Sequence, residues 1–213
     1  MTTATQTVKE RPILFSGGMV KAILDGRKTQ TRRVMKPQPI LDLNRSGQGN
    51  PFWLWLEGKK RAAFNYPNGD QSLIQFYCPY GKPGDRLWVR ETWGASGYGC
   101  SLPINQEAMS YRLKYGDETY GQCRRSPIHM PRWASRINLE ITNVRVERLN
   151  EISEEDADAE GISLTPSTFC YGDETPEMQS HRAAFQILWE KINGKKHPWS
   201  SNPWVWVVEF KKI

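Results

Sequence analysis

The chain has 213 residues, 38% of them hydrophobic and 24% charged, a composition typical of a globular protein with a sizeable core. No run reaches the roughly 18 apolar residues that predict a membrane-spanning helix, and residues 1–6 lack the apolar segment of a signal peptide, so we expect a cytoplasmic protein without a membrane partner. The net charge of +6 favours a polyanionic or nucleotide-like partner, although a basic soluble protein without such a partner has the same charge.

The cysteines and histidines predict neither disulfides nor a metal site. The four cysteines are widely separated and form no C-x-x-C pair, which indicates free thiols in a reducing compartment. The three histidines lack the paired spacing of a zinc site, and no glycine-rich phosphate loop occurs, so we expect no metal and no cofactor. These residues are Cys78, Cys100, Cys123, Cys170, His129, His181 and His197.

The N-terminal part predicts an arm, a strand and a helix. Residues 1–10 are polar and unpatterned, so we expect a flexible arm before a single domain over residues 11–213. Residues 13–15 predict a short buried strand. Ser16 is suited to cap a helix that Gly26 ends in a left-handed conformation. The apolar residues of this helix fall at helical spacing, at Met19, Val20, Ile23 and Leu24.

A strongly basic segment, residues 26–33, follows this helix and is predicted to be a loop. It reads Gly-Arg-Lys-Thr-Gln-Thr-Arg-Arg and carries four cations without a carboxylate. A threonine hydroxyl becomes a nucleophile when a base takes its proton, and a lysine is such a base when its arginine neighbours and burial keep it neutral. Lys28 and Thr31 fit these roles if the loop bends, because an extended chain places them on opposite sides. A loop that binds phosphate by charge alone is the alternative.

Two loop-rich insertions interrupt the domain, at about residues 37–80 and 94–131, where proline and glycine recur. Within the first insertion, residues 52–56 and 73–76 look like strands. Between the insertions, residues 86–93 alternate as a barrel strand does. Leu87, Val89 and Glu91 are predicted on one face, and Trp88, Arg90 and Thr92 on the other.

The C-terminal half predicts a long strand, two helices and a central strand. A strand begins at residue 137, and Ser153 with the acidic residues after it predicts a short helix that Gly161 ends. Residues 175–193 predict the longest helix, and residues 204–210, apolar on both faces, a central strand. In the long strand, Leu139, Ile141, Asn143 and Arg145 are expected to oppose Glu140, Thr142, Val144 and Val146. The longest helix has an apolar face, assigned to the core, of Met178, Phe185, Leu188, Trp189 and Ile192.

Glu160 breaks a local rule at the end of the short helix. The acidic residues 154–156 suit the positive end of the helix dipole, whereas Glu160 falls in the last turn, where the dipole disfavours an anion by about 0.3 to 1 kcal/mol. Such breaks are enriched at functional sites, which makes Glu160 a candidate functional residue, although a solvated glutamate is the commoner explanation.

Four segments, in this order, resemble the ASCH domain, a family with a PUA-like β-barrel. They are residues 15–32, which contain the Gly-Arg-Lys-Thr-x-Thr-Arg run, residues 84–89, residues 159–162 and residues 208–211. The resemblance implies an α+β fold, a small PUA-like barrel with flanking helices, here with two insertions. It also implies a cleft between the basic segment and the short helix.

The resemblance implies a function as well. Compact bacterial members of the family are amidohydrolases that remove the acetyl group from N4-acetylcytidine with a lysine, a threonine and a glutamate, and these roles fall on Lys28, Thr31 and Glu160. We therefore expect an amidohydrolase that acts on N4-acylated cytidine or a related cytosine nucleoside without a cofactor, with Thr31 or a water molecule as the nucleophile. Other members are thought to bind RNA through the same cleft, so a non-catalytic RNA-binding module is the alternative.

Residues beside the cleft are expected to bind the substrate. A tryptophan ring stacks on a pyrimidine for about 1 to 3 kcal/mol, and a carboxylate accepts a hydrogen bond from a base edge. Trp88 is more simply a core residue. We expect a small nucleoside as the partner, with RNA as the alternative, and a monomer or weak dimer. The expected substrate-binding residues are Arg27, Arg32, Arg90, Glu91 and Trp93.

Overall fold

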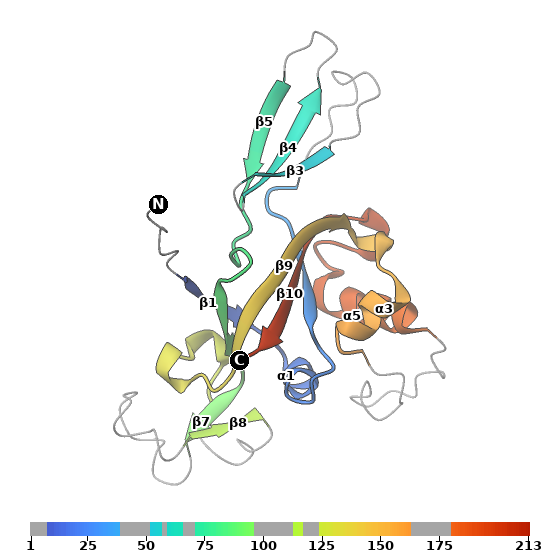
Figure 1. The fold of residues 1–213 in the computed structure, drawn as a ribbon. Helices are drawn as coiled ribbons and strands as arrows, with labels where there is room; N and C mark the ends of the chain where they lie inside the picture. The colour runs from blue at the N-terminus through green and yellow to red at the C-terminus, as the bar shows by residue number, and fades with distance from the viewer. Residues whose placement is uncertain are drawn as a thin grey trace, which may run out of the picture.

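The computed structural model describes residues 8–38, 52–56, 59–65, 71–95, 113–116, 124–162 and 180–213 (Figure 1). The described strands are β1 (Glu10–Leu14), β2 (Gln30–Val34), β3 (Phe52–Leu56), β4 (Lys59–Asn65), β5 (Gln71–Phe76), β6 (Arg86–Arg90), β7 (Trp93–Ala95), β8 (Leu113–Tyr115), β9 (Asn138–Arg148) and β10 (Trp204–Lys212). The described α-helices are α1 (Gly17–Leu24), α3 (Glu154–Ala159) and α5 (His181–Asn193). Short 3-10 helices occur at Pro127–His129, Arg132–Ala134, Leu149–Glu151 and Trp199–Ser201. None of the described helices is both long enough and apolar enough to cross a membrane.

Five strands form one mixed sheet in the order β1-β6-β9-β10-β2. β1 runs parallel to β6, and the other neighbours are antiparallel. This sheet, with its few helices, confirms the predicted α+β class. Within the described residues β1 and β2 are the two edges, so these strands form an open sheet and do not close into the barrel that the resemblance implies.

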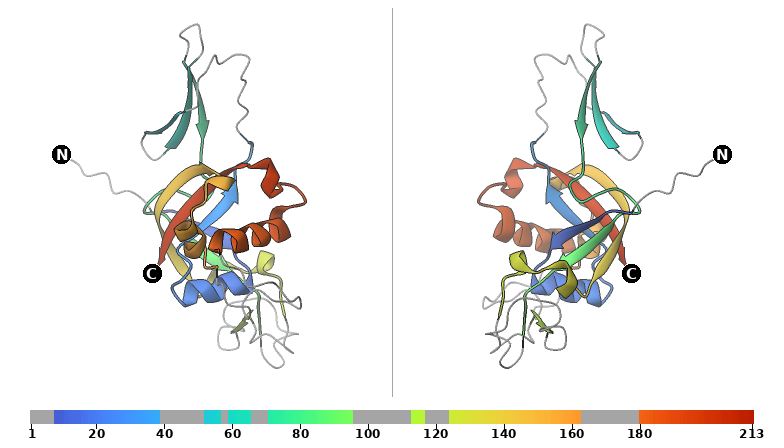
Figure 2. Two further views of the ribbon diagram at one scale, coloured as in Figure 1. Left: turned by 90° about the vertical axis from the view of Figure 1, so that its right-hand side faces the viewer. Right: turned by 90° about the vertical axis from the view of Figure 1, so that its left-hand side faces the viewer.

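The last strand, β10, lies in the middle of the sheet and is buried on both faces, as its sequence predicts. On one face Trp206, Val208 and Phe210 pack with residues of α1, β1, β6 and β9. On the other face Val205 and Val207 pack with residues of α3 and α5, and both helices lie on that side of the sheet (Figures 1 and 2). Each such side chain contributes about 1.5 to 3 kcal/mol when fully buried. β10 therefore contributes to both hydrophobic cores, one on each face of the sheet.

The long strand β9 contains a bulge that its sequence pattern does not reveal. Its pairing with β10 passes from Asn143 to Ile141 and leaves Thr142 without a partner across the strand pair. One extra residue shifts the alternation of side chains by one. The prediction of two opposing faces is therefore wrong, because the apolar residues before and after the bulge belong to the same core. These are Leu139, Ile141, Val144 and Val146.

The basic segment, residues 26–33, is a strand over much of its length and not the predicted loop. Gly26 follows the end of α1 with a φ of 77°, as expected. From Gln30 onward the chain forms β2, an edge strand antiparallel to β10, with Thr31 opposite Val208. The sequence favours a loop at this point because the strand that pairs with β2 lies at the other end of the chain.

Several predicted helix ends are confirmed, but Ser16 forms no side-chain capping hydrogen bond at the start of α1, and the longest described helix begins at His181 and not at residue 175. Ser153 Oγ accepts a hydrogen bond from the Asp156 backbone N–H at 3.1 Å at the start of α3. Gly161 follows the end of α3 with a φ of 82°. The longest described helix, α5, is capped by Ser180 and ends before Gly194.

The insertions form small sheets of their own. In the first, β3, β4 and β5 form an antiparallel sheet separate from the five-stranded one (Figure 1), and β4 was not predicted. In the second, β7 pairs with β8, so the predicted strand over residues 86–93 divides into β6 and β7. Other predictions fall outside the described residues, namely those on residues 1–7, on residues 175–179 and on Cys100, Cys123, Cys170 and Met178.

Candidate active site

Two segments that are far apart in the sequence meet at the end of α3. Lys28, just before β2, forms an isolated antiparallel bridge with Glu160, the residue that caps the end of α3. Lys28 Nζ donates hydrogen bonds to Glu160 Oε2 at 2.7 Å and to the Glu160 carbonyl oxygen at 2.9 Å. It also donates to the Gln30 carbonyl oxygen at 2.8 Å. Two of the predicted catalytic residues are thus in direct contact.

A glycine makes this close contact possible. Gly161 has a φ of 82°, a conformation that residues with a Cβ atom rarely adopt. A Cβ atom there would lie 2.8 Å from Lys28 Cβ and 2.7 Å from Ala22 Cβ. The Thr29 backbone N–H donates to the Ala159 carbonyl oxygen at 2.9 Å and closes the same junction. The glycine after Glu160 therefore allows α1 and Lys28 to pack against the end of α3.

Lys28 is fully buried among acceptors. Its side chain has an exposed fraction of 0%, and its three acceptor oxygens match the three protons of an ammonium group. Burial lowers the pKa of Lys28 below its ordinary value, whereas the charge and the hydrogen bond of Glu160 oppose this shift. Arg33 and Arg32 lower the pKa of Lys28 less than burial does. Burial, more than the arginines of the basic segment, is therefore the main cause of the shift.

Arg32 is the second cation that contacts Glu160. Its guanidinium donates to Glu160 Oε1 at 3.4 Å, to Asp156 Oδ2 at 2.6 Å and to Glu147 Oε2 at 3.0 Å. The side chain has an exposed fraction of 0%. Three carboxylates surround this one guanidinium, so its charge is compensated inside the fold and it helps to hold Glu160 in place.

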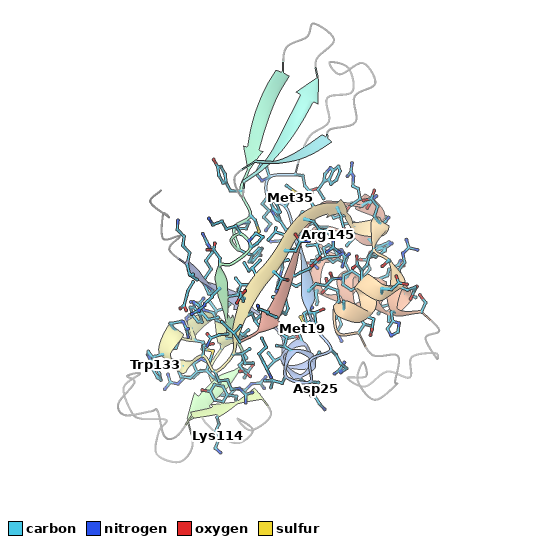
Figure 3. All side chains as sticks on the ribbon, in the orientation of Figure 1. Met19, Asp25, Met35, Lys114, Trp133 and Arg145 are labelled. Carbon is cyan, nitrogen blue, oxygen red and sulfur yellow. The ribbon has the colours of Figure 1, made fainter. Side chains whose placement is uncertain are left out.

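Arg145 extends these ion pairs along β9, on the side of the sheet that α3 covers (Figure 3). It donates to Asp156 Oδ2 at 2.8 Å and pairs with Glu209. Gln30 Nε2 donates to Asp156 Oδ1 at 3.0 Å. Burial alone would raise the pKa of Asp156, but hydrogen bonds from Gln30 and Arg32 and the charges of Arg32 and Arg145 lower it overall. Asp156 therefore remains a carboxylate that ties β2, β9 and α3 together.

A cavity of about 380 Å³ lies beside these ion pairs. Thr31, Arg32 and Glu160 line it, whereas Lys28 is not among its lining residues. Much of the remaining lining comes from β2 and α5. The apolar part from α5 consists of Phe185, Leu188, Trp189 and Ile192. Thr31 and Glu160 thus have access to a space of the size that small ligands occupy.

Thr31 lies on this cavity without contacting Lys28. It is buried within β2, with an exposed fraction of 3%. Among the described residues no hydrogen bond joins Lys28 to Thr31, because the donors of Lys28 are directed at Gln30 and Glu160. The extended chain of β2 accounts for this, since residues three apart in an extended chain point to opposite sides.

Arg27 lies outside the cavity lining. It is exposed and donates to Asp25 Oδ2 at 3.1 Å and to the Gly161 carbonyl oxygen at 3.3 Å. Its contacts connect the end of α1 to the residue after Glu160. The structure therefore assigns it a place near the junction of the two motifs but no contact with the space that Thr31 faces.

Arg90, Glu91 and Trp93 also lie apart from the cavity. Glu91 is 2% exposed and accepts two hydrogen bonds from Arg136, at 2.9 and 3.0 Å. Trp93 is fully buried in a separate small core, and the guanidinium of Arg90 stacks on the Trp88 ring at 4.7 Å. The division of the predicted strand into β6 and β7 accounts for this placement. None of the three lines the cavity, so nothing here supports their prediction as substrate-binding residues.

Several residues that line the cavity were not predicted from the sequence. Tyr80 lies within the first predicted insertion, and burial raises the pKa of its hydroxyl although Arg33 opposes the shift. Phe185 and Trp189 belong to the core, as predicted, and also line the cavity. Helical spacing identifies such residues as apolar without distinguishing a core from a pocket wall.

Among the described residues, no group of three or more histidine, cysteine, aspartate or glutamate side chains is arranged to hold a metal ion.

Comparisons with known proteins add no relative. No family model matches the sequence, no curated protein matches it, and no solved structure matches its fold. The resemblance to the ASCH family therefore rests on the motifs in the sequence.

Proposed function

We propose that this chain is an amidohydrolase of the ASCH type that removes the acyl group from an N4-acylated cytosine nucleoside, and that its open five-stranded sheet is related to the PUA-like barrel. The observation that carries the proposal is the meeting of two motifs at one cavity. Thr31 and Glu160 line this cavity, and Glu160 is bound to the buried Lys28. A lysine, a threonine and a glutamate are the residues that the resemblance to the ASCH amidohydrolases implies for this reaction.

In the proposed reaction Thr31 Oγ1 forms a bond to the acyl carbon while its proton passes to Glu160, which lines the cavity, and from Glu160 to Lys28, which acts in its neutral form. The bond from the acyl carbon to N4 then breaks, the electron pair stays on N4, and the proton returns from Lys28 through Glu160 to this amino group. Water hydrolyses the resulting ester, which releases the acid and restores the threonine. A water nucleophile activated by Glu160 is the alternative route through the same residues.

The burial of Lys28 and Arg32 favours this proposal over phosphate binding by the basic segment. Both side chains have an exposed fraction of 0% and contact acceptors of the protein. Burial favours the neutral form of a lysine, which is the form that a base requires. An RNA-binding module would instead present these cations to solvent, where they would contact phosphates.

The lining from α5 suits a pyrimidine ring. Phe185, Leu188 and Trp189 supply apolar surface on the cavity that Thr31 and Glu160 also face. Small-molecule sites commonly combine such a wall with a few polar groups that fix the orientation of the ligand. A cytosine ring packed against α5 would bring its N4 substituent toward the polar side of the cavity.

Incubation of the purified protein with N4-acetylcytidine, with loss of the acylated chromophore followed by absorbance, tests the proposal. We expect hydrolysis by the wild-type protein and a fall in kcat of about 10²- to 10⁴-fold in Lys28→Arg, Thr31→Ala and Glu160→Gln. The arginine variant is the most informative, since arginine keeps the charge but does not deprotonate. Lys21→Arg, the same exchange at an exposed position of α1, is the matched control and should keep full activity.

Two outcomes would count against the proposal. Unchanged turnover in all three site variants would remove these residues from the mechanism. No turnover of any N4-acylated cytosine derivative would favour the RNA-binding module, in which Lys28→Arg is tolerated and binding weakens steeply with salt. Mass spectrometry of the enzyme during turnover separates the two nucleophiles, since an acyl group attached to Thr31 forms only in the threonine route.

A further inference from the structure

The cavity beside Thr31 has a second polar region, which is strongly basic. Five of the described residues that line the cavity are cations, whereas Glu160 is the single carboxylate among them. Glu160 is already paired with Lys28 and Arg32. The remaining positive charge therefore has no counterpart on the described cavity wall. It comes from Arg33, Lys36, Lys195 and Lys196.

These four cations come from two elements that are distant in the sequence. Arg33 belongs to β2 and Lys36 follows it, whereas Lys195 and Lys196 follow the end of α5. A helix C-terminus attracts lysines through its dipole, which explains the second pair without any ligand. The helix dipole does not explain why Arg33 and Lys36 line the same cavity.

The charges of these four cations are not neutralised within the described part of the fold. No described carboxylate forms an ion pair with any of the four, and the three lysines are exposed. Arg33 donates to the Leu14 carbonyl oxygen at 2.6 Å, and its guanidinium stacks on the Phe15 ring at 5.3 Å. Neither contact neutralises the charge of Arg33. Within the residues that the structure describes, this part of the cavity lacks an anion.

We propose that the cavity binds a phosphorylated substrate, an N4-acylated cytosine mononucleotide, with its phosphate held by the lysines and Arg33. This inference rests on the proposed function and names the substrate class of the same site. The base packs against the apolar wall from α5, the acyl group lies at Thr31 and Glu160, and the phosphate lies at the cations. A cavity of about 380 Å³ is at the small end of ligand sites and fits one nucleotide better than a polymer.

Binding of the expected reaction products tests the phosphate site without relying on turnover. Isothermal titration should show that cytidine 5′-monophosphate binds about 10- to 100-fold more tightly than cytidine, the gain expected from charge-assisted hydrogen bonds to phosphate. The difference should shrink at high salt. The double variant Lys195→Ala/Lys196→Ala should lose most of it. Lys191→Ala/Lys212→Ala, which removes the same charge from two exposed lysines outside the cavity lining, should retain it.

Turnover gives the second measurement. The wild-type protein should show a higher kcat/KM for N4-acetylcytidine 5′-monophosphate than for N4-acetylcytidine. Lys195→Ala/Lys196→Ala should lower the value for the nucleotide, mainly through KM, and should lower it more than the value for the nucleoside. A short acylated RNA that is hydrolysed faster than the mononucleotide would overturn the assignment to a mononucleotide.

The two proposals fail in different ways. Equal binding of cytidine and its monophosphate, with hydrolysis of the acylated nucleoside intact, would overturn the phosphate site and leave the amidohydrolase standing. Tight binding of the monophosphate that depends on Lys195 and Lys196, without hydrolysis of any acylated substrate, would support the phosphate site and reject the reaction. An equal loss of binding in the control double variant would also reject the site, since it would show an effect of net charge alone.

Discussion

Lys28 is held between two opposing influences. Its burial favours the neutral amine, whereas Glu160 Oε2 at 2.7 Å favours the ammonium ion. Three acceptors around Nζ fit the ammonium form, so the proposed reaction requires that Lys28 first lose one of its protons. The proton that Lys28 Nζ donates to Glu160 Oε2 faces a carboxylate, which can accept it. Lys28 and Glu160 can therefore hold a proton between them, and Glu160 lines the cavity.

This balance predicts how the titration of Lys28 responds to a change at Glu160. In the wild-type protein the Lys28 amine should titrate below about 10.4, the ordinary value for lysine. In Glu160→Gln the pKa of Lys28 should fall further, because the substitution removes the charge that opposes the effect of burial. Nitrogen-15 NMR of the lysine Nζ signals across alkaline and neutral pH measures both values.

The same spectra contain a control for this prediction. Lys28→Arg removes one Nζ signal and thereby assigns it, while the signals of the other lysines should stay in place. A higher pKa of Lys28 in Glu160→Gln than in the wild-type protein would contradict the prediction. It would mean that contacts other than Glu160 hold the proton on Lys28.

At the scale of the elements, the close packing between α1 and the end of α3 requires a glycine at position 161. Gly161 has a φ of 82° and approaches Lys28 and Ala22 so closely that a Cβ atom would overlap both. A left-handed residue with a Cβ costs about 1 to 2 kcal/mol, and overpacking costs a further 1 to 3 kcal/mol or so. Gly161→Ala should therefore lower the free energy of unfolding by about 2 to 5 kcal/mol and displace Glu160 from Lys28.

Gly26 provides a matched control for this substitution. It also has a positive φ, of 77°, but a Cβ atom there would meet nothing within 4 Å. Gly26→Ala should show the conformational cost alone, about 1 to 2 kcal/mol. Urea denaturation of both variants compares them, and equal losses would show that the close contact at Gly161 contributes nothing.

Features that depend on neighbouring residues could be predicted from the sequence, whereas features that depend on a distant strand could not. Both glycines were identified from the sequence, because a left-handed residue at a helix end is a local preference. β2 was not, since a segment with four cations predicts a loop until β10 is known to pair with its second half. The bulge at Thr142 was hidden for the same reason, because it exists only as a mismatch between β9 and β10.

At the scale of the whole molecule, the candidate site was predictable only where motifs carried it. Lys28 and Glu160 were placed together by the resemblance and are in contact in the structure, while their catalytic roles remain predictions. The wall from α5 and the lysines after it had no motif, and a periodic apolar face predicts burial without saying what it faces. Arg90 and Trp93 do not line the cavity, and alternation alone could not show where β6 ends.

Two carboxylates in separate parts of the domain, Asp156 in α3 and Asp85 just before β6, link the stability of the domain to pH. Asp156 joins β2, β9 and α3. Asp85 accepts hydrogen bonds from the Lys9 and Lys82 backbone N–H groups, at 3.1 and 3.2 Å, and from Arg11 at 2.9 Å. Burial alone would raise the pKa of Asp85, but these hydrogen bonds and the Arg11 charge lower it overall. Both carboxylates therefore have a lower pKa in the folded chain than in the unfolded one.

The sign of the resulting acid dependence follows from this difference. Above about pH 5 both states are ionised and the stabilisation is fully present, whereas below the unfolded value of about 3.9 the unfolded chain binds protons that the folded chain does not. The midpoint of urea denaturation should therefore fall as the pH is lowered from about 5 through the folded pKa values. Asp156→Asn and Asp85→Asn should each flatten this fall, and because the two residues share no partner among the residues that the structure describes, their effects should add in the double variant. A double variant that loses stability in acid as steeply as the wild-type protein would show that other carboxylates control the acid transition.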